Sequence, residues 1–265
     1  MSTVAAVLPR ELAPGVHWLG DCFVFPPHPG EELQHAYTSV YLVEGAERSL
    51  VVDTGNPRDW PAVERHLDER LAAGAPPVEW IFPTHVEVAH AGNTGRLLAK
   101  FPDARLVADL HDHHLVNPDL TDRFVHVRVG DRVDLGGRRF EFVDAVFRDL
   151  ASTLWGYDTG AGVLFCGDGL GFGHYHAAEH CGRLTEEIPD LPIQELTGQF
   201  LEAALYWTRL KSAAPHIARL EQLIAIDLDV RLIAPAHGSP ITDPGATVPR
   251  ILEGLETLAA ERRLR

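Results

Sequence analysis

The sequence lacks the features that mark several classes of protein. None of its apolar runs approaches the roughly 20 residues of a transmembrane helix, and its first 15 residues carry a Pro and charges where a secretory signal peptide has its apolar stretch. No repeat with a period between about 20 and 50 residues and no linker rich in Gly and Ser divides the chain. We therefore expect one cytoplasmic domain over residues 1–265, with no membrane partner.

Cysteine is scarce. There are three cysteines, Cys22, Cys166 and Cys181, and no pair has the C-x-x-C spacing. An odd number without that spacing gives neither a disulfide framework nor a cysteine-based zinc module. We expect reduced thiols, with Cys166 filling a buried strand.

Positive charge is also scarce, because 23 Lys and Arg stand against 38 Asp and Glu, for a net charge of −15. A chain with this balance repels a phosphate backbone and an anionic bilayer alike, so we expect no nucleic-acid partner. The hydrophobic content of 45% and the charged content of 23% are typical of a globular protein with a substantial core.

Short β-rich runs alternate with helical ones along the chain. The runs predict strands at 16–19, 38–43, 49–52, 78–82, 105–108, 162–166 and 230–234, and several more between 124 and 143. Helices are predicted at 61–73, 91–101, within 193–226 and at 248–264. The strands come in two batches, each followed by helices. This pattern predicts the α/β class, with two sheets packed face to face and helices outside.

Histidine is abundant, with 15 residues, and the segment PTHVEVAHAGN at 83–93 is the most informative place where it gathers. A helix would place His85 and His90 about 140° apart, so a shared metal needs an irregular loop. In extended geometry His85 and Glu87 point the same way, and the chain can then turn at His90 into the following helix. Taken alone, this segment could be an incidental His-rich turn. Three other segments that each follow a predicted strand argue against that: SLVVDTG, LFCGDG and LIAPAHG.

Together these four segments resemble the metallo-β-lactamase superfamily, and the His-x-Glu form of the loop is similar to its flavodiiron branch rather than to its hydrolases. The resemblance implies a four-layer αββα sandwich. It also implies a non-haem diiron oxidoreductase that activates dioxygen, or reduces dioxygen or nitric oxide, at a two-metal site.

The resemblance implies a set of six metal ligands. One metal would take His85, Glu87 and Asp149, the other would take His90 and His237, and Asp168 would bridge them. Two positions depart from the family. Ala89 stands where the family has a loop Asp, and Asp149 stands where it has a later His; Asp149 could instead form a plain ion pair with a neighbouring Arg. Asp53 is expected to orient the loop rather than to bind metal.

Carboxylates mixed with imidazoles favour iron or manganese over zinc, so the expected cofactor is a pair of iron ions, with manganese or zinc as alternatives. Superfamily hydrolases have a His and an Asp where this chain has Glu87 and Ala89, which argues against hydrolysis. No Gly/Ser/Thr-rich phosphate loop of a flavodoxin domain is present, so no flavin is expected. Electrons would then come from the substrate or from a separate electron-donor protein.

Further residues are candidates for catalytic roles. Tyr157 could reach bound oxygen species, while His174 and His176 could donate protons or replace the missing ligand, or could be ordinary loop histidines. His28 and His35 lie in a Pro-rich loop that could cover the site. The run HDHH at 111–114 is typical of a helix start rather than of a second metal site.

Two other functions stay open. One is a metal-dependent hydrolase of esters, lactones or thioesters, in which a metal-bound hydroxide is the nucleophile. The other is a non-catalytic sensor of oxygen or nitric oxide, which the lost ligand at Ala89 favours. The sequence leaves the small-molecule substrate undetermined, and it leaves open whether the protein is a homodimer.

Overall fold

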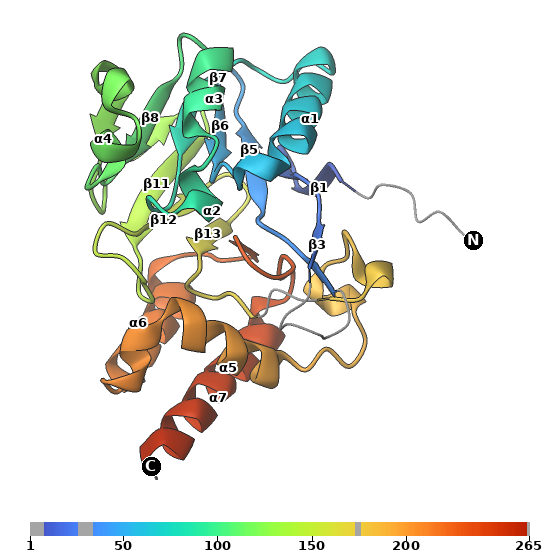
Figure 1. Ribbon diagram of the computed structural model, residues 1–265, viewed down its shortest axis with the longest axis vertical. Helices are drawn as coiled ribbons and strands as arrows, with labels where there is room; N and C mark the ends of the chain where they lie inside the picture. Colours follow the sequence, from blue (N-terminus) through green and yellow to red (C-terminus); the bar gives the residue numbers. More distant parts are fainter. Residues whose placement is uncertain (1–7, 26–33, 173–175, 264–265) are drawn as a thin grey trace.

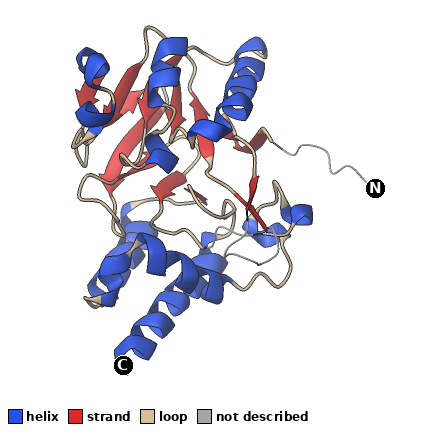
Figure 2. Ribbon diagram, viewed as in Figure 1, coloured by secondary structure: helices blue, strands red, loops and turns tan. Residues whose placement is uncertain are grey.

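Two β-sheets face each other, and helices cover their outer sides (Figures 1 and 2). The structure is a computed structural model and describes residues 8–25, 34–172 and 176–263. The four-layer αββα sandwich predicted from the sequence is confirmed. Within the described part of the chain, no helix is both long enough and apolar enough to cross a membrane.

The first sheet has seven strands in the order β1-β2-β5-β6-β7-β8-β9. Their bounds are β1 (Arg10–Ala13), β2 (Val16–Leu19), β5 (Val40–Glu44), β6 (Ser49–Val52), β7 (Val78–Phe82), β8 (Arg105–Ala108) and β9 (Phe124–His126). The strands from β1 to β6 pair antiparallel, and those from β6 to β9 pair parallel. Parallel pairing brings the carboxyl ends of β6 and β7 to the same edge of the sheet.

The second sheet has five strands in the order β10-β11-β12-β13-β14. These are β10 (Arg132–Asp134), β11 (Arg139–Asp144), β12 (Leu154–Asp158), β13 (Val163–Gly167) and β14 (Leu232–Pro235). The last two strands are parallel, so the loops after β13 and β14 leave the sheet side by side. A separate hairpin of β3 (Phe23–Phe25) and β4 (Gln34–Ala36) stands outside both sheets.

Seven α-helices complete the described part of the chain, together with short 3-10 and π turns. They are α1 (Trp60–Ala72), α2 (Val88–Ala91), α3 (Thr94–Lys100), α4 (His113–Val116), α5 (Ile193–Ala204), α6 (Ala214–Gln222) and α7 (Pro244–Arg263). Helices α1 and α3 cover the first sheet, and α5, α6 and α7 cover the second (Figure 1).

Period-two alternation within each strand builds three apolar layers. In β5, Tyr41 and Val43 point toward the second sheet, whereas Val40 and Leu42 point toward α1 and α3. In β13, Phe165 lies between the sheets and Leu164 faces the helices of the second sheet. Each large apolar side chain fully buried in this way contributes about 2 kcal/mol to stability. The buried strands hold the loops at their ends in fixed positions.

The candidate metal ligands of the sequence lie in loops at these strand ends. The loop with His85 and His90 follows β7, Asp168 follows β13, and His237 follows β14. Asp149 lies in the connection from β11 to β12. Four segments that are far apart in the sequence therefore converge at one edge of the sandwich.

Candidate metal centre

The loop from Thr84 to Glu87 is irregular, and α2 begins only at Val88. Asp53 fixes this loop. Its Oδ1 accepts hydrogen bonds from the backbone N of Thr84 at 2.8 Å and from the Thr84 hydroxyl at 2.9 Å. Asp53 adopts a left-handed φ of 53°, a conformation more accessible to Asp than to most side chains. Its carboxylate thus orients the loop, as expected from the sequence.

Each of the three histidines has its Nδ1 atom engaged. Nδ1 of His90 lies 3.0 Å from Asp53 Oδ2, Nδ1 of His85 lies 3.3 Å from the Thr84 hydroxyl, and Nδ1 of His237 lies 3.1 Å from the carbonyl oxygen of Tyr37. A partner on one ring nitrogen fixes the tautomer and aims the other nitrogen. All three Nε2 atoms then lie next to a carboxylate of the centre.

A first group of ligand atoms surrounds His85. Its Nε2 lies 3.1 Å from Asp149 Oδ2 and 4.0 Å from Glu87 Oε2. With Asp168 added, the four residues offer one ligand atom each within 4.8 Å of one another. His85 is completely buried, whereas the Glu87 side chain is 55% exposed. This group is the one that the sequence assigns to the first metal and the bridge.

A second group shares Asp168. Its Oδ1 lies 3.2 Å from His90 Nε2 and 3.3 Å from His237 Nε2. The rings of His85 and His90 lie with their centroids 3.8 Å apart, so the two groups are contiguous. Ala89, half-buried in α2, adds no ligand atom to the second group.

These residues fit a pair of metal ions. Among the described residues, His85 Nε2, His90 Nε2 and Asp168 Oδ1 are buried atoms that make no hydrogen bond of good geometry, although they lie near one another. A buried polar atom without a partner costs about 1–3 kcal/mol. Cations between these atoms would satisfy them, and three carboxylates beside three imidazoles are donors that suit iron or manganese.

The charges of the centre favour ionised carboxylates. Burial alone would raise the pKa of Asp168, but the nearby charges of His90 and His237 hold it far below its usual range. Burial likewise opposes ionisation of Asp149, and its contact with His85 lowers its pKa. Metal ligands of this type must be deprotonated, so both carboxylates are in the form that binds a cation.

Tyr157 is not brought to this centre. Leu154, at the start of β12, donates its backbone N to the carbonyl oxygen of Thr84 at 3.0 Å, whereas Tyr157 lies three residues further along the strand, about 10 Å away. Its hydroxyl donates to the carbonyl oxygen of Asp229 at 2.9 Å. The prediction that Tyr157 reaches bound oxygen species is therefore wrong, because the strand carries it away from the ligand loop.

His176 also lies elsewhere. Its backbone forms a two-hydrogen-bond bridge with His35, which turns both rings toward Cys22 and Cys181. The prediction that His176 donates protons at the centre or replaces the missing ligand is therefore wrong, and His35 is likewise engaged in this cluster. His174 and His28 lie outside the described residues.

His113 is a buried histidine whose position beside the centre the sequence did not reveal. Neither of its ring nitrogens has a hydrogen-bond partner within the described part of the chain. Burial and the charge of His85 lower its pKa to about 4, so the imidazole is neutral at pH 7. The neighbouring His111 and His114 are exposed. The HDHH run marked the location, but local sequence could not show that one of its members is turned inward.

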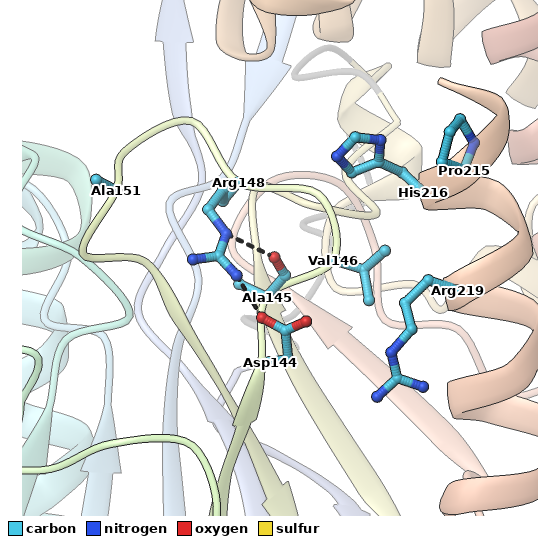
Figure 3. Close-up of a pocket in the computed structure, with 8 residues that line it drawn as sticks. All are labelled: Asp144, Ala145, Val146, Arg148, Ala151, Pro215, His216 and Arg219. Atoms are coloured by element: carbon cyan, nitrogen blue, oxygen red, sulfur yellow. Dashed lines mark hydrogen bonds and ion pairs between the residues drawn. The ribbon is translucent and has the colours of Figure 1, made fainter. Parts of the chain in front are cut away.

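A pocket of about 490 Å³ opens behind the loop that holds Asp149 (Figure 3). Arg148 lies across it and donates to the carbonyl oxygen of Ala145 at 2.9 Å and to the Asp144 carboxylate. The Arg148 carbonyl oxygen accepts a hydrogen bond from Trp207 Nε1 at 2.7 Å. On the far wall, α6 contributes Pro215, His216 and Arg219. Arg148, the residue before Asp149, is thus anchored by its hydrogen bonds to Ala145, Asp144 and Trp207.

A family model and two relatives of known name match most of this chain. The family model of the Metallo-beta-lactamase superfamily matches residues 34–237. A coenzyme F420H(2) oxidase of Methanocaldococcus jannaschii is 27% identical over 249 residues, which is 88% of this chain and 57% of the relative. An anaerobic nitric oxide reductase flavorubredoxin of Salmonella typhi is 25% identical over 236 residues, which is 84% of this chain and 46% of the relative.

Solved structures show the same fold. The flavodiiron protein from Giardia intestinalis matches with a TM-score of 0.71 at 19% identity, over 94% of this chain and 59% of that chain. This chain thus spans roughly half to three fifths of the length of the relatives it matches. The resemblance to the flavodiiron branch that the four segments predict is confirmed by these relatives.

Proposed function

The chain belongs to the metallo-beta-lactamase superfamily, and from this premise we propose that residues 1–265 form one domain that acts as a non-haem diiron oxidoreductase on dioxygen or nitric oxide. The observation that carries the proposal is that, among the residues that the structure describes, buried ligand atoms of His85, His90 and Asp168 lack hydrogen-bond partners and lie close together. The names of the relatives, an oxidase and a nitric oxide reductase, support the same chemistry.

Six side chains are proposed to hold the metals. His85, Glu87 and Asp149 serve the first position, His90 and His237 serve the second, and Asp168 lies between them. Three carboxylates favour iron, with manganese as the next choice and zinc as the least suited. Bound iron would supply the change in oxidation state that reduction of a diatomic gas needs.

The protein groups around the centre position the ligands and exclude water. Asp53 and the carbonyl oxygen of Tyr37 each hold one histidine ring with its Nε2 directed inward. Of the six proposed ligands, Glu87 is the most exposed, so we place the route from solvent beside its carboxylate.

Electrons are proposed to come from a separate donor protein, or from the substrate itself. Gas reduction also consumes protons, and His174 stays a proposed proton donor. The neutral His113 imidazole, buried near His85, is a second group able to accept and pass on a proton at a ring nitrogen.

A non-catalytic sensor of oxygen or nitric oxide is the second candidate function. Ala89 favours it, because a second metal held only by His90, His237 and the shared Asp168 has fewer anionic ligands than the first. Weaker anionic ligation would leave a bound gas without the electron density that its reduction requires.

The test uses the full chain purified without oxygen and loaded with ferrous iron. About two irons per chain and repeated consumption of dioxygen or nitric oxide in the presence of an external electron donor are expected. A single stable gas adduct without turnover would instead favour the sensor. Failure to retain iron, combined with zinc-supported hydrolysis of acyl substrates, would replace the proposal with the hydrolase.

A further inference from the structure

Two cysteines and two histidines meet beside the β3–β4 hairpin, in a group that shares no residue with the centre described above. Cys22 precedes β3 and His35 lies in β4. His176 and Cys181 belong to the connection between β13 and β14, on either side of the 3-10 helix Ala178–His180. Figure 1 shows this segment beside the hairpin. All four side chains are half-buried.

The backbone sets this arrangement. His35 N donates to the carbonyl oxygen of His176 at 3.0 Å, and His176 N donates to the carbonyl oxygen of His35 at 2.7 Å. This reciprocal pair places the two histidines directly opposite each other across an antiparallel bridge. One cysteine from each segment then flanks the pair.

The four ligand atoms form a compact group. His35 Nδ1 lies 3.1 Å from Cys22 Sγ and 3.2 Å from Cys181 Sγ. The two sulfurs lie 3.2 Å apart, and Cys181 Sγ lies 3.5 Å from His176 Nε2. All four atoms are within 4.8 Å of one another.

These distances approach the edges of a zinc tetrahedron. Zinc bonds of about 2.3 Å to sulfur and about 2.0 Å to nitrogen give edges of about 3.8 Å between two sulfurs and about 3.5 Å between sulfur and nitrogen. Outward shifts of about 0.3 Å per sulfur would therefore make room for a cation. A disulfide would need the sulfurs at about 2.05 Å, and both cysteines are free.

We propose that Cys22, His35, His176 and Cys181 bind one divalent cation of the zinc class in a closed, four-ligand structural site that fastens the β3–β4 hairpin to the segment from His176 to Cys181. Binding displaces the thiol protons to solvent, and two thiolates then neutralise the two positive charges of the cation. With four protein ligands, no position is left for a substrate.

The donor set separates this site from the centre at Asp168. Thiolates are soft ligands that select zinc, whereas the carboxylates around Asp168 suit iron or manganese. Both thiol protons leave when the cation binds.

The site also lies next to a residue of the candidate centre. The Tyr37 ring stacks on the His176 ring with centroids 4.7 Å apart, and the Tyr37 hydroxyl accepts a hydrogen bond from the backbone N of Gly182. The carbonyl oxygen of the same Tyr37 faces His237 Nδ1 at 3.1 Å. A cation that holds His176 and Cys181 in place therefore also fixes Tyr37, whose carbonyl oxygen orients the His237 ring.

The first experiment uses the unmodified full chain, purified with a reductant and without chelators. X-ray absorption at the zinc edge should give about one zinc per chain with two sulfur and two nitrogen neighbours. Cobalt(II) added to chelator-treated protein should give the visible bands of a tetrahedral thiolate complex at about one equivalent. Zinc with oxygen-rich ligands only, or an absence of thiolate bands while the thiols are free, would overturn the proposal.

The variants Cys22→Ser and Cys181→Ser should each abolish the cobalt–thiolate bands and lose the zinc, while iron at the other site is retained. Cys166→Ala and His180→Ala are the matched controls, since Cys166 is a core cysteine and His180 adjoins Cys181 without belonging to the cluster. Bands that persist in either serine variant would contradict the four-ligand assignment. So would a disulfide between Cys22 and Cys181 in the reduced preparation. The readouts do not involve gas reduction, so they stand even if the proposed function fails.

Discussion

The candidate centre at Asp168 and the cysteine–histidine cluster use different ligands on different scaffolds. The ligands of the centre follow strands of the two sheets, and several are fully buried and held by hydrogen bonds to Asp53, Thr84 and Tyr37. The ligands of the cluster lie on a two-stranded hairpin and a 3-10 turn outside the sheets, and they are half-buried.

This difference separates two roles for a bound cation. A site on buried strand ends is organised before the metal arrives, so its metal contributes reactivity more than stability. A site between a small hairpin and a loop has little core of its own, so its metal contributes to holding the fold together. We therefore expect metal loss from the centre to cost activity, and metal loss from the cluster to cost stability.

The largest effect should come from Asp168→Asn. The amide keeps the shape but removes the negative charge between His90 and His237, so both metal positions lose their shared ligand. Gas reduction should fall at least about 100-fold and iron content should drop sharply. Zinc at the cluster should stay, which elemental analysis of the purified variant would measure. Parallel loss of both metals would show that the two regions are not independent.

Removal of the metals should show that the cation at the cluster contributes more to stability than the ions at the centre. A strong chelator removes the bound cation. A ligand that binds only the native state stabilises it by about 4 kcal/mol when its free concentration is about 1,000 times its Kd. Its removal should therefore lower the Tm by about 10 °C for a chain of this size. Adding back zinc should restore most of the lost Tm, measured by calorimetry, whereas ferrous iron alone should restore a smaller part of it. Full recovery with iron alone would reverse the assignment of roles.

Asp53→Asn should affect only the centre. The amide cannot accept as the carboxylate does from Thr84 while also holding Nδ1 of His90, so the His90 ring loses its fixed orientation. Iron affinity at the second position should fall about 10–100-fold with little change in Tm. Competition with a coloured iron chelator measures this. Asn can adopt the left-handed backbone conformation of Asp53, so the substitution should not strain the fold. A large drop in Tm alongside the loss of iron affinity would contradict a positioning role for Asp53.

Ala89→Asp should strengthen the second metal position by adding the loop carboxylate that the family has there. Ala89 is half-buried in α2, so its neighbours leave some room for a larger side chain. We expect slower loss of the second iron to chelator, by a few-fold, and faster gas reduction. Unchanged iron release would mean that the second position does not lie beside Ala89.

The smallest effect should come from Glu187→Gln, beside the cluster. Arg10 pairs with Glu187 and also donates to the carbonyl oxygen of Gly182, and this pairing lowers the pKa of Glu187 to about 2. The folded pKa is below the unfolded one, so the stabilisation is present above a pH of about 4.5 and is lost as the pH falls toward 2. The substitution should cost less than about 1 kcal/mol at pH 7, and urea unfolding should show this difference shrinking in acid.

Much of the fold could be predicted because apolar periodicity and flanking Pro and Gly residues are local signals. The helix expected at 61–73 is α1, Trp60–Ala72, bounded by Gly74. The strand β12 escaped prediction because its sequence, LWGYD, contains a glycine. The reason is tertiary: the Phe140 ring occupies the space that a Cβ at Gly156 would need. Such packing across strands is invisible in one segment of sequence.

The two sites also differ in how far local sequence can predict them. The sequence predicts that His85, Asp168 and His237 form one metal site, because each of them follows a recognisable strand motif. The cluster has no such motif, since Cys22 and Cys181 are 159 residues apart and the bridge between His35 and His176 joins segments with weak propensity. The odd cysteine count pointed away from a metal module, although two of the three thiols converge.

The most direct test of the diiron centre is anomalous diffraction from crystals grown without oxygen from iron-loaded protein, with data collected at the iron and zinc edges. Two iron peaks should flank Asp168, one near His85 and one between His90 and His237. Absence of iron at these residues in fully loaded crystals, or iron bound only at Cys22 and Cys181, would contradict this assignment.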